Sequence, residues 1–187
     1  SNGSYYVWPS VPILKSANLA RIKVYDLYNK NVSNVSGLFN IIGSVKLNSP
    51  NGGENWTAGS SRSITWTSYA VTQLNISYQM NGGSWNVINA TFAMNDTVQQ
   101  MSWPISSTIA LSNQTLIRIS DTDNEANATD DSDATFNITA LFDIPDPDGP
   151  ADILIAGDPY EITWDKTGSG MSEVLLEYST DGNTWRN

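Results

Sequence analysis

The sequence predicts an all-β protein built from tandem antiparallel β-sandwich repeats of about 95–100 residues. Three observations lead to this prediction. Hydrophobic and polar residues alternate with a period of two along short segments, no stretch shows helical periodicity, and two sets of motifs recur at a spacing of 95 to 100 residues. Alternation is typical of strands that bury one face, and short strands at about ten-residue spacing are typical of a sandwich.

The opening of the best-defined repeat is SPNGGENWTAGSSRSITW, residues 49–66. Its Pro-Asn-Gly-Gly segment, 50–53, is expected to form a turn, because Gly adopts positive φ angles without steric cost. In the strand that follows, Ile64 and Trp66 share one face. We therefore expect Trp56 and Trp66 to anchor a core beneath the turn.

The next predicted strand is LNISYQM, residues 74–80, whose four hydrophobic side chains at positions 74, 76, 78 and 80 share one face. Asn-Gly-Gly at 81–83 then predicts a hairpin turn. The segment SWNVI returns from it, and Trp85 and Val87 are expected to point inward.

The repeat divides the chain into three parts. Residues 1–43 are predicted to be the second half of a unit, 44–140 a complete unit, and 141–187 the first half of a further unit. Two sets of motif pairs support this division. The first aligns residues 20–41 with 117–138, so that Arg21 matches Arg118 and Asp26 matches Asp123, and it also aligns Trp8 with Trp103. The second aligns Ile64-Thr65-Trp66 with Ile162-Thr163-Trp164 and Tyr78 with Tyr178.

A half-sandwich would leave an apolar face and open strand edges in water, which is unstable. Two arrangements would remove this problem. The sequence is either a window from a longer repeat chain, or the tail half of one copy completes the head half of a neighbour, as in donor-strand complementation. In both cases the expected partners are neighbouring repeats of the same or an adjacent chain.

Charge and composition exclude several classes of function. The net charge is −10 with only nine Lys and Arg residues, which argues against nucleic acid as a partner. No apolar run is long enough for membrane insertion, and the first residues show no signal peptide. The chain has no Cys and no His, so it lacks a disulfide framework and the commonest general base. We therefore expect no enzyme activity.

Asn-x-Ser/Thr sequons are unusually frequent, with ten in the chain where chance would give roughly five. This enrichment favours a glycosylated protein on the cell surface, although an Asn- and Thr-rich β-protein also forms sequons by accident. Asn75 and Asn137 are expected to point outward from strands, and Asn31, Asn34, Asn89, Asn95, Asn113 and Asn127 to lie in loops. The ten candidate glycosylation sites are Asn2, Asn31, Asn34, Asn55, Asn75, Asn89, Asn95, Asn113, Asn127 and Asn137.

The motifs NGGENWTAGSSRSITWTS, NISYQMNGGSW, SWPI and IRISDTDN…DDSDATFNI together resemble the Ig-like/fibronectin-III-like repeats of large microbial cell-surface proteins. They are similar to the Kre9/KNH-type Ser/Thr-rich cell-wall module. This resemblance implies an Ig-like sandwich used as a spacer or adhesive unit, and covers residues 45–138 in full. The third unit departs from the pattern, since Leu154 stands where the second unit has Trp56.

One stretch carries the residues of a candidate metal site, because hard cations such as Ca²⁺ prefer several oxygen ligands. It is DTDNEANATDDSD, residues 121–133, which lacks the Gly and Glu positions of an EF-hand loop. A solvated acidic loop is the alternative, so calcium is a candidate cofactor and none is certain. The candidate ligands are Asp121, Asp123, Glu125, Asp130, Asp131 and Asp133.

These observations favour a non-enzymatic structural segment of a large extracellular or cell-surface repeat protein, such as a stalk, sheath or filament. Two alternatives stay open. The first is an adhesin or carbohydrate-binding module that recognises glycans or surface proteins, for which Tyr5, Tyr6, Tyr28 and Tyr69 are the less constrained aromatic residues. The second is an accessory domain of a secreted hydrolase.

Overall fold

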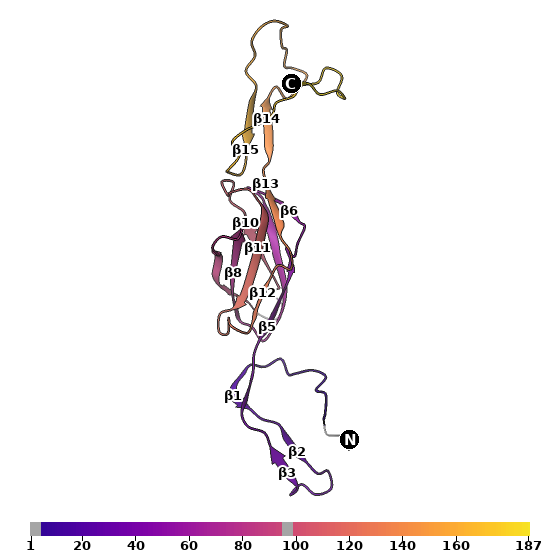
Figure 1. The fold of residues 1–187 in the computed structure, drawn as a ribbon, viewed down its shortest axis with the longest axis vertical. Coiled ribbons are helices and arrows are strands. Elements are labelled where there is room, and N and C mark those ends of the chain that lie inside the picture. The colour runs from indigo at the N-terminus through magenta and orange to yellow at the C-terminus, as the bar shows by residue number, and fades with distance from the viewer. Residues whose placement is uncertain (1–4, 95–98) are drawn as a thin grey trace.

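The computed structural model describes residues 5–94 and 99–187, and all the regular secondary structure in these two ranges is β-strand. The all-β prediction is therefore confirmed. Figure 1 shows a central body, residues 44–139, with an N-terminal arm, residues 5–43, at one end and a C-terminal arm, residues 140–187, at the opposite end. Within the described residues, no helix is long and apolar enough to cross a membrane.

The central body contains two sheets. The three-stranded sheet has the order β10-β7-β5, and the larger sheet has the order β6-β13-β11-β8-β9 with β12 beside β11. All pairings are antiparallel except that of β6 with β13. The strands are β5 (Ser44–Ser49), β6 (Asn55–Thr57), β7 (Ser61–Tyr69), β8 (Gln73–Met80), β9 (Asn86–Ala93), β10 (Gln100–Pro104), β11 (Ser112–Asp121), β12 (Thr129–Asp131) and β13 (Phe136–Thr139).

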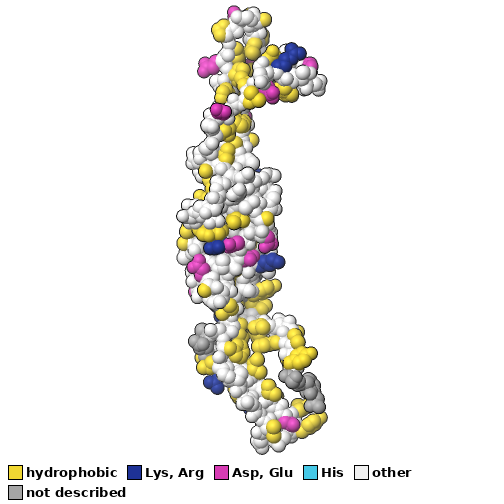
Figure 2. Space-filling model, in the orientation of Figure 1, with side chains coloured by type: hydrophobic (Ala, Val, Ile, Leu, Met, Phe, Trp, Pro, Cys, Tyr) yellow, Lys and Arg dark blue, Asp and Glu magenta, His cyan; other side chains and the backbone are white. Residues whose placement is uncertain are grey.

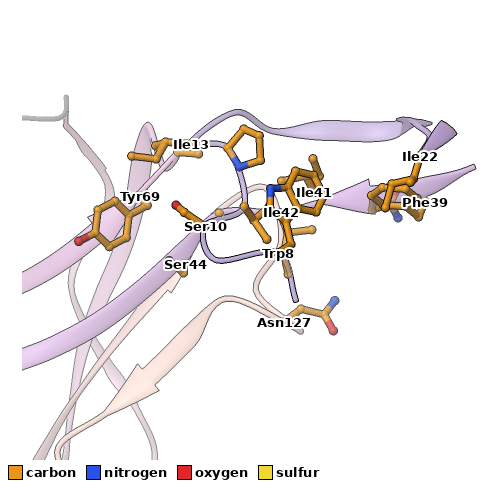
Figure 3. Close-up of a pocket in the computed structure, with 15 residues that line it drawn as sticks. Trp8, Ser10, Ile13, Ile22, Phe39, Ile41, Ile42, Ser44, Tyr69 and Asn127 are labelled. Carbon is orange, nitrogen blue, oxygen red and sulfur yellow. The ribbon is translucent and has the colours of Figure 1, made fainter. Parts of the chain in front are cut away.

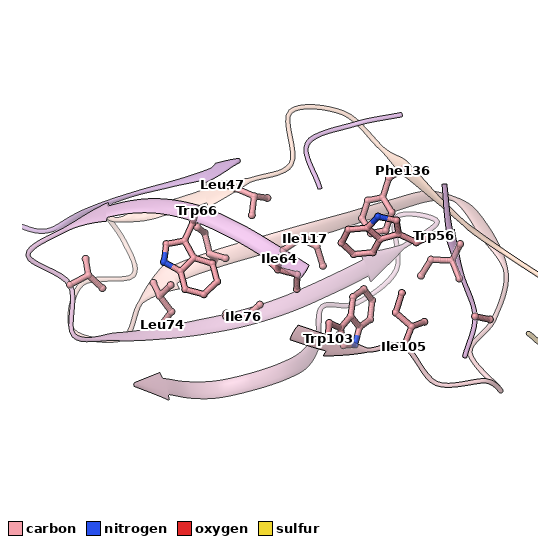
Figure 4. Packing of buried hydrophobic residues seen from close by; sticks show 14 residues of the cluster. Leu47, Trp56, Ile64, Trp66, Leu74, Ile76, Trp103, Ile105, Ile117 and Phe136 are labelled. Atoms are coloured by element: carbon pink, nitrogen blue, oxygen red, sulfur yellow. The ribbon is translucent and has the colours of Figure 1, made fainter. Parts of the chain in front are cut away.

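The core lies between these sheets, giving the body a sandwich-like character (Figure 4). Ile64 and Trp66 of β7 are buried, as the alternation predicted. The Trp56 ring lies 4.9 Å from that of Phe136, so it closes one end of the core. The other buried hydrophobic members are Leu47, Ala58, Val71, Leu74, Ile76, Trp103, Ile105, Ile117, Ile119 and Ile138.

The predicted turn at 50–53 is also confirmed. Gly52 and Gly53 have φ angles of 129° and 82°. A Cβ atom on Gly52 would lie 2.6 Å from the Cβ atom of Ala134, so both φ and space require glycine there. The two carboxylate oxygens of Glu54 accept hydrogen bonds from the Asn51 and Gly52 amides, and these bonds close the turn above Trp56.

The predicted hairpin at 81–83 joins β8 to β9, but the inward direction predicted for Val87 is wrong. Val87 is 60% exposed, and Ile88 packs against the core in its place. The β8–β9 register shifts twice, and each shift reverses which residues face the core. The inward prediction is also wrong for Trp85, which is partly buried outside the core, where the Arg118 guanidinium carbon lies 4.2 Å from its ring centroid.

Each arm contains short strands and little buried surface. The strands of the N-terminal arm pair as β1 with β4 and β2 with β3, and those of the C-terminal arm as β14 with β15. Hydrophobic side chains are exposed along both arms (Figure 2). The arm strands are β1 (Ser16–Ala20), β2 (Lys23–Tyr25), β3 (Ser33–Val35), β4 (Phe39–Ile41), β14 (Phe142–Asp146) and β15 (Thr163–Lys166).

Candidate functional site

The C-terminal arm has the same strand pairing as the first hairpin of the central body. Each paired residue of β14 lies 97 positions after its counterpart in β5, and each of β15 lies 98 positions after its counterpart in β7. Both hairpins also contain a register shift at the same place. The corresponding pairs are Val45–Ser68, Lys46–Thr67 and Ser49–Thr65 in the body, and Phe142–Lys166, Asp143–Asp165 and Asp146–Thr163 in the arm.

The correspondence continues beyond these strands. Tyr78 pairs with Asn86 in the body, and Tyr178 pairs with Arg186, 100 positions later, in the arm. Backbone angles agree as well, since turn residues with positive φ in the body have counterparts with positive φ in the arm. These pairs are Gly59 with Gly157, Ala70 with Gly168, and Gly82 with Gly182. The C-terminal arm therefore repeats the β5–β7 pairing and these turns, whereas the positions that correspond to β6 and β8 do not form strands in it.

The N-terminal arm resembles β11 to β13. In the body, the buried Ser132 hydroxyl accepts a hydrogen bond from the Ile117 amide, and in the arm the Ser36 hydroxyl accepts one from the Ile22 amide. Ser36 and Ile22 thus lie 96 and 95 positions before their counterparts. The Ser132 hydroxyl donates to the distant Pro50 carbonyl, whereas the Ser36 hydroxyl donates to the carbonyl of the next residue, Gly37.

This geometry corrects one part of the sequence alignment. The amide of Asp26 donates to the Val32 carbonyl, and the amide of Asp121 donates to the Ala128 carbonyl in the same position of the loop. Asp26 therefore corresponds to Asp121 and not to Asp123. The Arg-Ile identity at positions 21–22 favours a spacing of 97, but the spacing is 95 at Asp26, and the arm reaches the corresponding pairing with one residue fewer.

Positions that form the core of the body are hydrophobic and exposed in the arms. Trp66 is 1% exposed, whereas its counterpart Trp164 is 42% exposed. The other pairs with this contrast are Trp103 with Trp8, Ile117 with Ile22, Leu74 with Val174, and Ile76 with Leu176. Hydrophobic side chains stabilise a fold only when another layer covers them, and in the described residues these arm side chains are exposed.

Two joints connect the arms to the body. At the first joint, the Lys15 ammonium lies 2.8 Å from Oδ2 of the fully buried Asp121 and 3.0 Å from Oδ2 of Asp123. Burial alone would lower the pKa of Lys15, but the hydrogen bonds to these two carboxylates raise it. The ammonium therefore stays charged and neutralises a carboxylate inside the body.

An apolar pocket lies beside this ion pair, between the arm and the end of the body (Figure 3). The arm contributes the Trp8 ring and the side chains of Val11 and Ile13, and the body contributes Tyr69 and Asn127. The pocket surrounds the connection between β4 and β5, so it belongs to the joint.

The second joint is made mainly by backbone hydrogen bonds. The Gly168 amide donates to the Ser107 carbonyl at 2.7 Å, and Ser169 both donates to the Ile109 carbonyl and accepts from the Leu111 amide. At the second joint, the segment between β10 and β11 thus contacts the turn after β15. At the first joint, Ile13, which precedes β1, and Ala70, which follows β7, line the same pocket. Ala70 and Gly168, the corresponding turn residues, both have positive φ.

The acidic residues of the predicted calcium site are all described, and they do not converge. Among the described residues, no three acidic side chains lie close enough to hold a metal ion. Five of the six use oxygens for protein donors, and calcium binding stays a prediction. These donors are Lys15 for Asp121 and Asp123, the Leu47 amide for Asp130, the Arg118 guanidinium for Asp131, and the Asn51 side-chain amide for Asp133.

The sequons are spread over the arms and the body, and Asn2 and Asn95 lie outside the described residues. Asn31 and Asn127 lie in turns as predicted, whereas Asn34, Asn89 and Asn113 lie in strands, so the loop prediction is wrong for these three. The side-chain oxygen of Asn75 is buried. The side-chain amide of Asn137 donates to the side-chain oxygen of Asn55, an exposed sequon residue on the neighbouring strand. Glycosylation at any of them stays a prediction.

No family model, curated protein or solved structure matches this chain.

Proposed function

We propose that the chain is a non-enzymatic structural segment of a large extracellular or cell-surface repeat protein, such as a stalk, sheath or filament, made of tandem Ig-like modules. The observation that carries this proposal is the correspondence between each arm and one half of the body. The β14–β15 pairing follows the β5–β7 pairing position by position. A chain in which the same half-sandwiches follow each other is organised as a series of modules.

The strand order supports the Ig-like part of the proposal. Strands β5, β7 and β10 correspond to strands A, B and E of an Ig-like domain, and β8, β9, β11 and β13 to strands C, C′, F and G. The short β6 lies beside β13, so the edge of the larger sheet is extended by the segment that carries Trp56.

The joints support a mechanical role. Modules connected by a flexible linker bend freely, whereas these joints contain an ion pair to the buried Asp121 and several backbone hydrogen bonds at Gly168 and Ser169. The connections are also short, because β13 ends at Thr139 and β14 begins at Phe142. A stack of such modules would resist bending and extension.

Protease shaving of intact source cells tests the proposal. Brief trypsin treatment should release peptides from this chain without cell lysis, together with peptides that carry glycans at exposed sequons. A cytoplasmic protein measured in the same supernatant controls for lysis. Recovery of this chain only after the cells are broken would contradict an extracellular location.

A second candidate function is an adhesin, favoured by the exposure of aromatic rings on the N-terminal arm. Tyr28 is 96% exposed, and Tyr5 and Tyr6 are nearly as exposed. Exposed rings are surfaces on which sugars stack. Reproducible binding to a glycan array that is lost in the Tyr28→Ala variant would favour this candidate, and a binding profile without any hit would remove it.

A further inference from the structure

We propose that Asn81 is a site of spontaneous deamidation, with water as the co-reactant, and that the folded chain protects Asn51 from the same reaction. The chain contains the sequence Asn-Gly-Gly twice, at 51–53 and at 81–83. Asparagine followed by glycine is prone to this reaction, because glycine has no side chain to hinder attack by its own backbone nitrogen. The two sites share this local sequence, so a difference between them has to come from the fold. The inference does not depend on the proposed function.

The reaction at Asn81 has two steps. In the first, the Gly82 backbone nitrogen loses its proton to hydroxide and bonds to Cγ of Asn81. The bond from Cγ to Nδ2 breaks, and the side-chain nitrogen takes up a proton from water and leaves as ammonia. In the second step, water opens the five-membered succinimide ring. Opening between Cγ and the Gly82 nitrogen gives aspartate, whereas opening at the main-chain carbonyl gives isoaspartate, in which the backbone runs through the side chain.

The reacting groups of Asn81 and Gly82 are accessible. Both residues are exposed in the turn after β8, with φ angles of 52° and 68°, and the Gly83 amide closes this turn by donating to the Met80 carbonyl. Among the described residues, neither the Gly82 amide nor Nδ2 of Asn81 has a hydrogen-bond acceptor. The nucleophile and the leaving group are therefore both free.

The carbon under attack is also activated. The Ser112 hydroxyl donates a hydrogen bond of 3.0 Å to Oδ1 of Asn81. A donor at this oxygen polarises the amide and stabilises the negative charge that develops on the oxygen when the nitrogen attacks. Ser112 lies at the start of β11 and is buried, so the donor is held in place by the sheet.

The same groups are occupied at Asn51. The Gly52 amide donates to a carboxylate oxygen of Glu54 at 2.8 Å, and the negative charge there opposes loss of the amide proton. Nδ2 of Asn51 donates to the Asp133 carboxylate at 2.7 Å, and Oδ1 accepts from the Asp133 amide. These bonds have to open before the ring can close, so deamidation of Asn51 should be at least about tenfold slower than that of Asn81.

The C-terminal arm indicates which product the turn accommodates. By the strand registers, Asn81 corresponds to Asp181, whose carboxylate accepts hydrogen bonds from the Asn183 and Thr184 amides. Aspartate is thus compatible with this turn. Isoaspartate adds a methylene group to the backbone of the turn, and loop length sets the register of a hairpin. We therefore expect the isoaspartate product to loosen the pairing of β8 with β9.

Peptide mapping by mass spectrometry tests the proposal on the purified full chain, incubated at neutral and at mildly alkaline pH. The Asn81 peptide should convert first, to a mixture of isoaspartate and aspartate, and faster at the higher pH because the attacking nitrogen must lose a proton. The Asn51 peptide should stay largely intact. In concentrated urea the two peptides should convert at similar rates, since their local sequences match. Enzymatic methylation of isoaspartate gives an independent measure of that product.

Substitution of Glu54 tests the cause of the protection. Glu54→Ala removes the acceptor of the Gly52 amide and should accelerate deamidation of Asn51 severalfold. The matched control Glu54→Gln keeps a side-chain oxygen as acceptor and should accelerate it less. The rate at Asn81 in the same samples should be unchanged, which shows that the variants remain folded.

Three outcomes would overturn the inference. They are conversion of Asn51 as fast as Asn81 in the folded chain, conversion of Asn81 only after unfolding in urea, and an unchanged rate at Asn51 in the Glu54→Ala variant. None of them bears on the location of the protein, which the protease treatment of intact cells tests separately.

Discussion

The Lys15 ammonium lies 2.8 Å from the carboxylate of Asp121, so a side chain of the N-terminal arm neutralises a charge buried in the central body. Asp121 is fully buried at the end of β11 and also accepts a hydrogen bond from the Asp123 amide. The pair joins two parts of the chain that are far apart in sequence, and it makes the arm contribute to the stability of the body.

Lys15→Ala should therefore destabilise the central body by about 1–3 kcal/mol, because it leaves the buried carboxylate without its cation. Urea unfolding followed by Trp fluorescence measures this loss. Adding Asp121→Asn should recover part of it, since the neutral amide needs no counter-charge and the two substitutions act on one interaction. Strictly additive losses in the double variant would contradict the ion pair.

The same ion pair predicts a pH dependence. The pKa of Lys15 is raised above its ordinary value of 10.5 in the folded chain. Its contribution to stability is therefore fully present below pH 10.5 and decreases as the pH rises through the folded pKa. The difference in unfolding free energy between the wild type and Lys15→Ala should be constant from neutral pH to about pH 10 and shrink above it. A difference that grows with pH would contradict this assignment.

Ser132→Ala should cost the body about 1–3 kcal/mol, because the buried hydroxyl bonds the Ile117 amide and the Pro50 carbonyl. Ser36→Ala is the matched control. The Ser36 hydroxyl makes the corresponding bond to Ile22 in the exposed N-terminal arm, so its loss should change the unfolding midpoint of the body very little. Equal effects of the two substitutions would contradict the different burial of the two sites.

Trp66→Ala and Trp164→Ala form a second matched pair, since the two residues occupy corresponding positions. Trp66 fills the core, and its removal should cost about 3–5 kcal/mol in thermal or urea unfolding. Trp164→Ala should change the same transition by less than about 0.5 kcal/mol at concentrations where the chain is monomeric. A large effect of Trp164→Ala under those conditions would mean that the arm already packs its Trp.

Glycopeptide mapping of the native protein should find Asn75 unmodified and find glycans at exposed sequons such as Asn31 and Asn127. Asn75 lies on a central strand, is half-buried and has its side-chain oxygen buried, so a glycan on the same amide group would be crowded by the neighbouring strands. An occupied Asn75 would contradict the packing around β8.

Alternation along the chain is sufficient to predict β7, which carries Ile64 and Trp66, and β8, which carries Leu74 and Ile76. Both strands are long, and each has one polar face. The direction of Val87 was wrong because bulges in the β8–β9 pairing change the alternation. Such bulges depend on the partner strand, which the local pattern does not reveal. The motif spacing predicts a match between Asp26 and Asp123, whereas the backbone hydrogen bonds place Asp26 in the position of Asp121.

The joint itself could not be predicted from the sequence. Lys15 lies outside the aligned motifs, and its partner Asp121 belonged to a stretch whose acidic residues suggested calcium. The fold instead gives those carboxylates different protein donors, including the Arg118 guanidinium for Asp131. Contacts between residues more than a hundred positions apart leave no periodic signal in the sequence.

The most direct measurement of the central claim, that the two arms are halves of one module, is the folding of a fusion protein. It would contain residues 141–187, then residues 88–95 to supply the positions between the two halves, then residues 1–43. If the arms are complementary halves, the fusion should unfold in a single cooperative transition with buried Trp fluorescence, and replacing Trp164 with Ala should destabilise it strongly. A chain that shows no cooperative transition and solvent-exposed Trp emission would contradict the account.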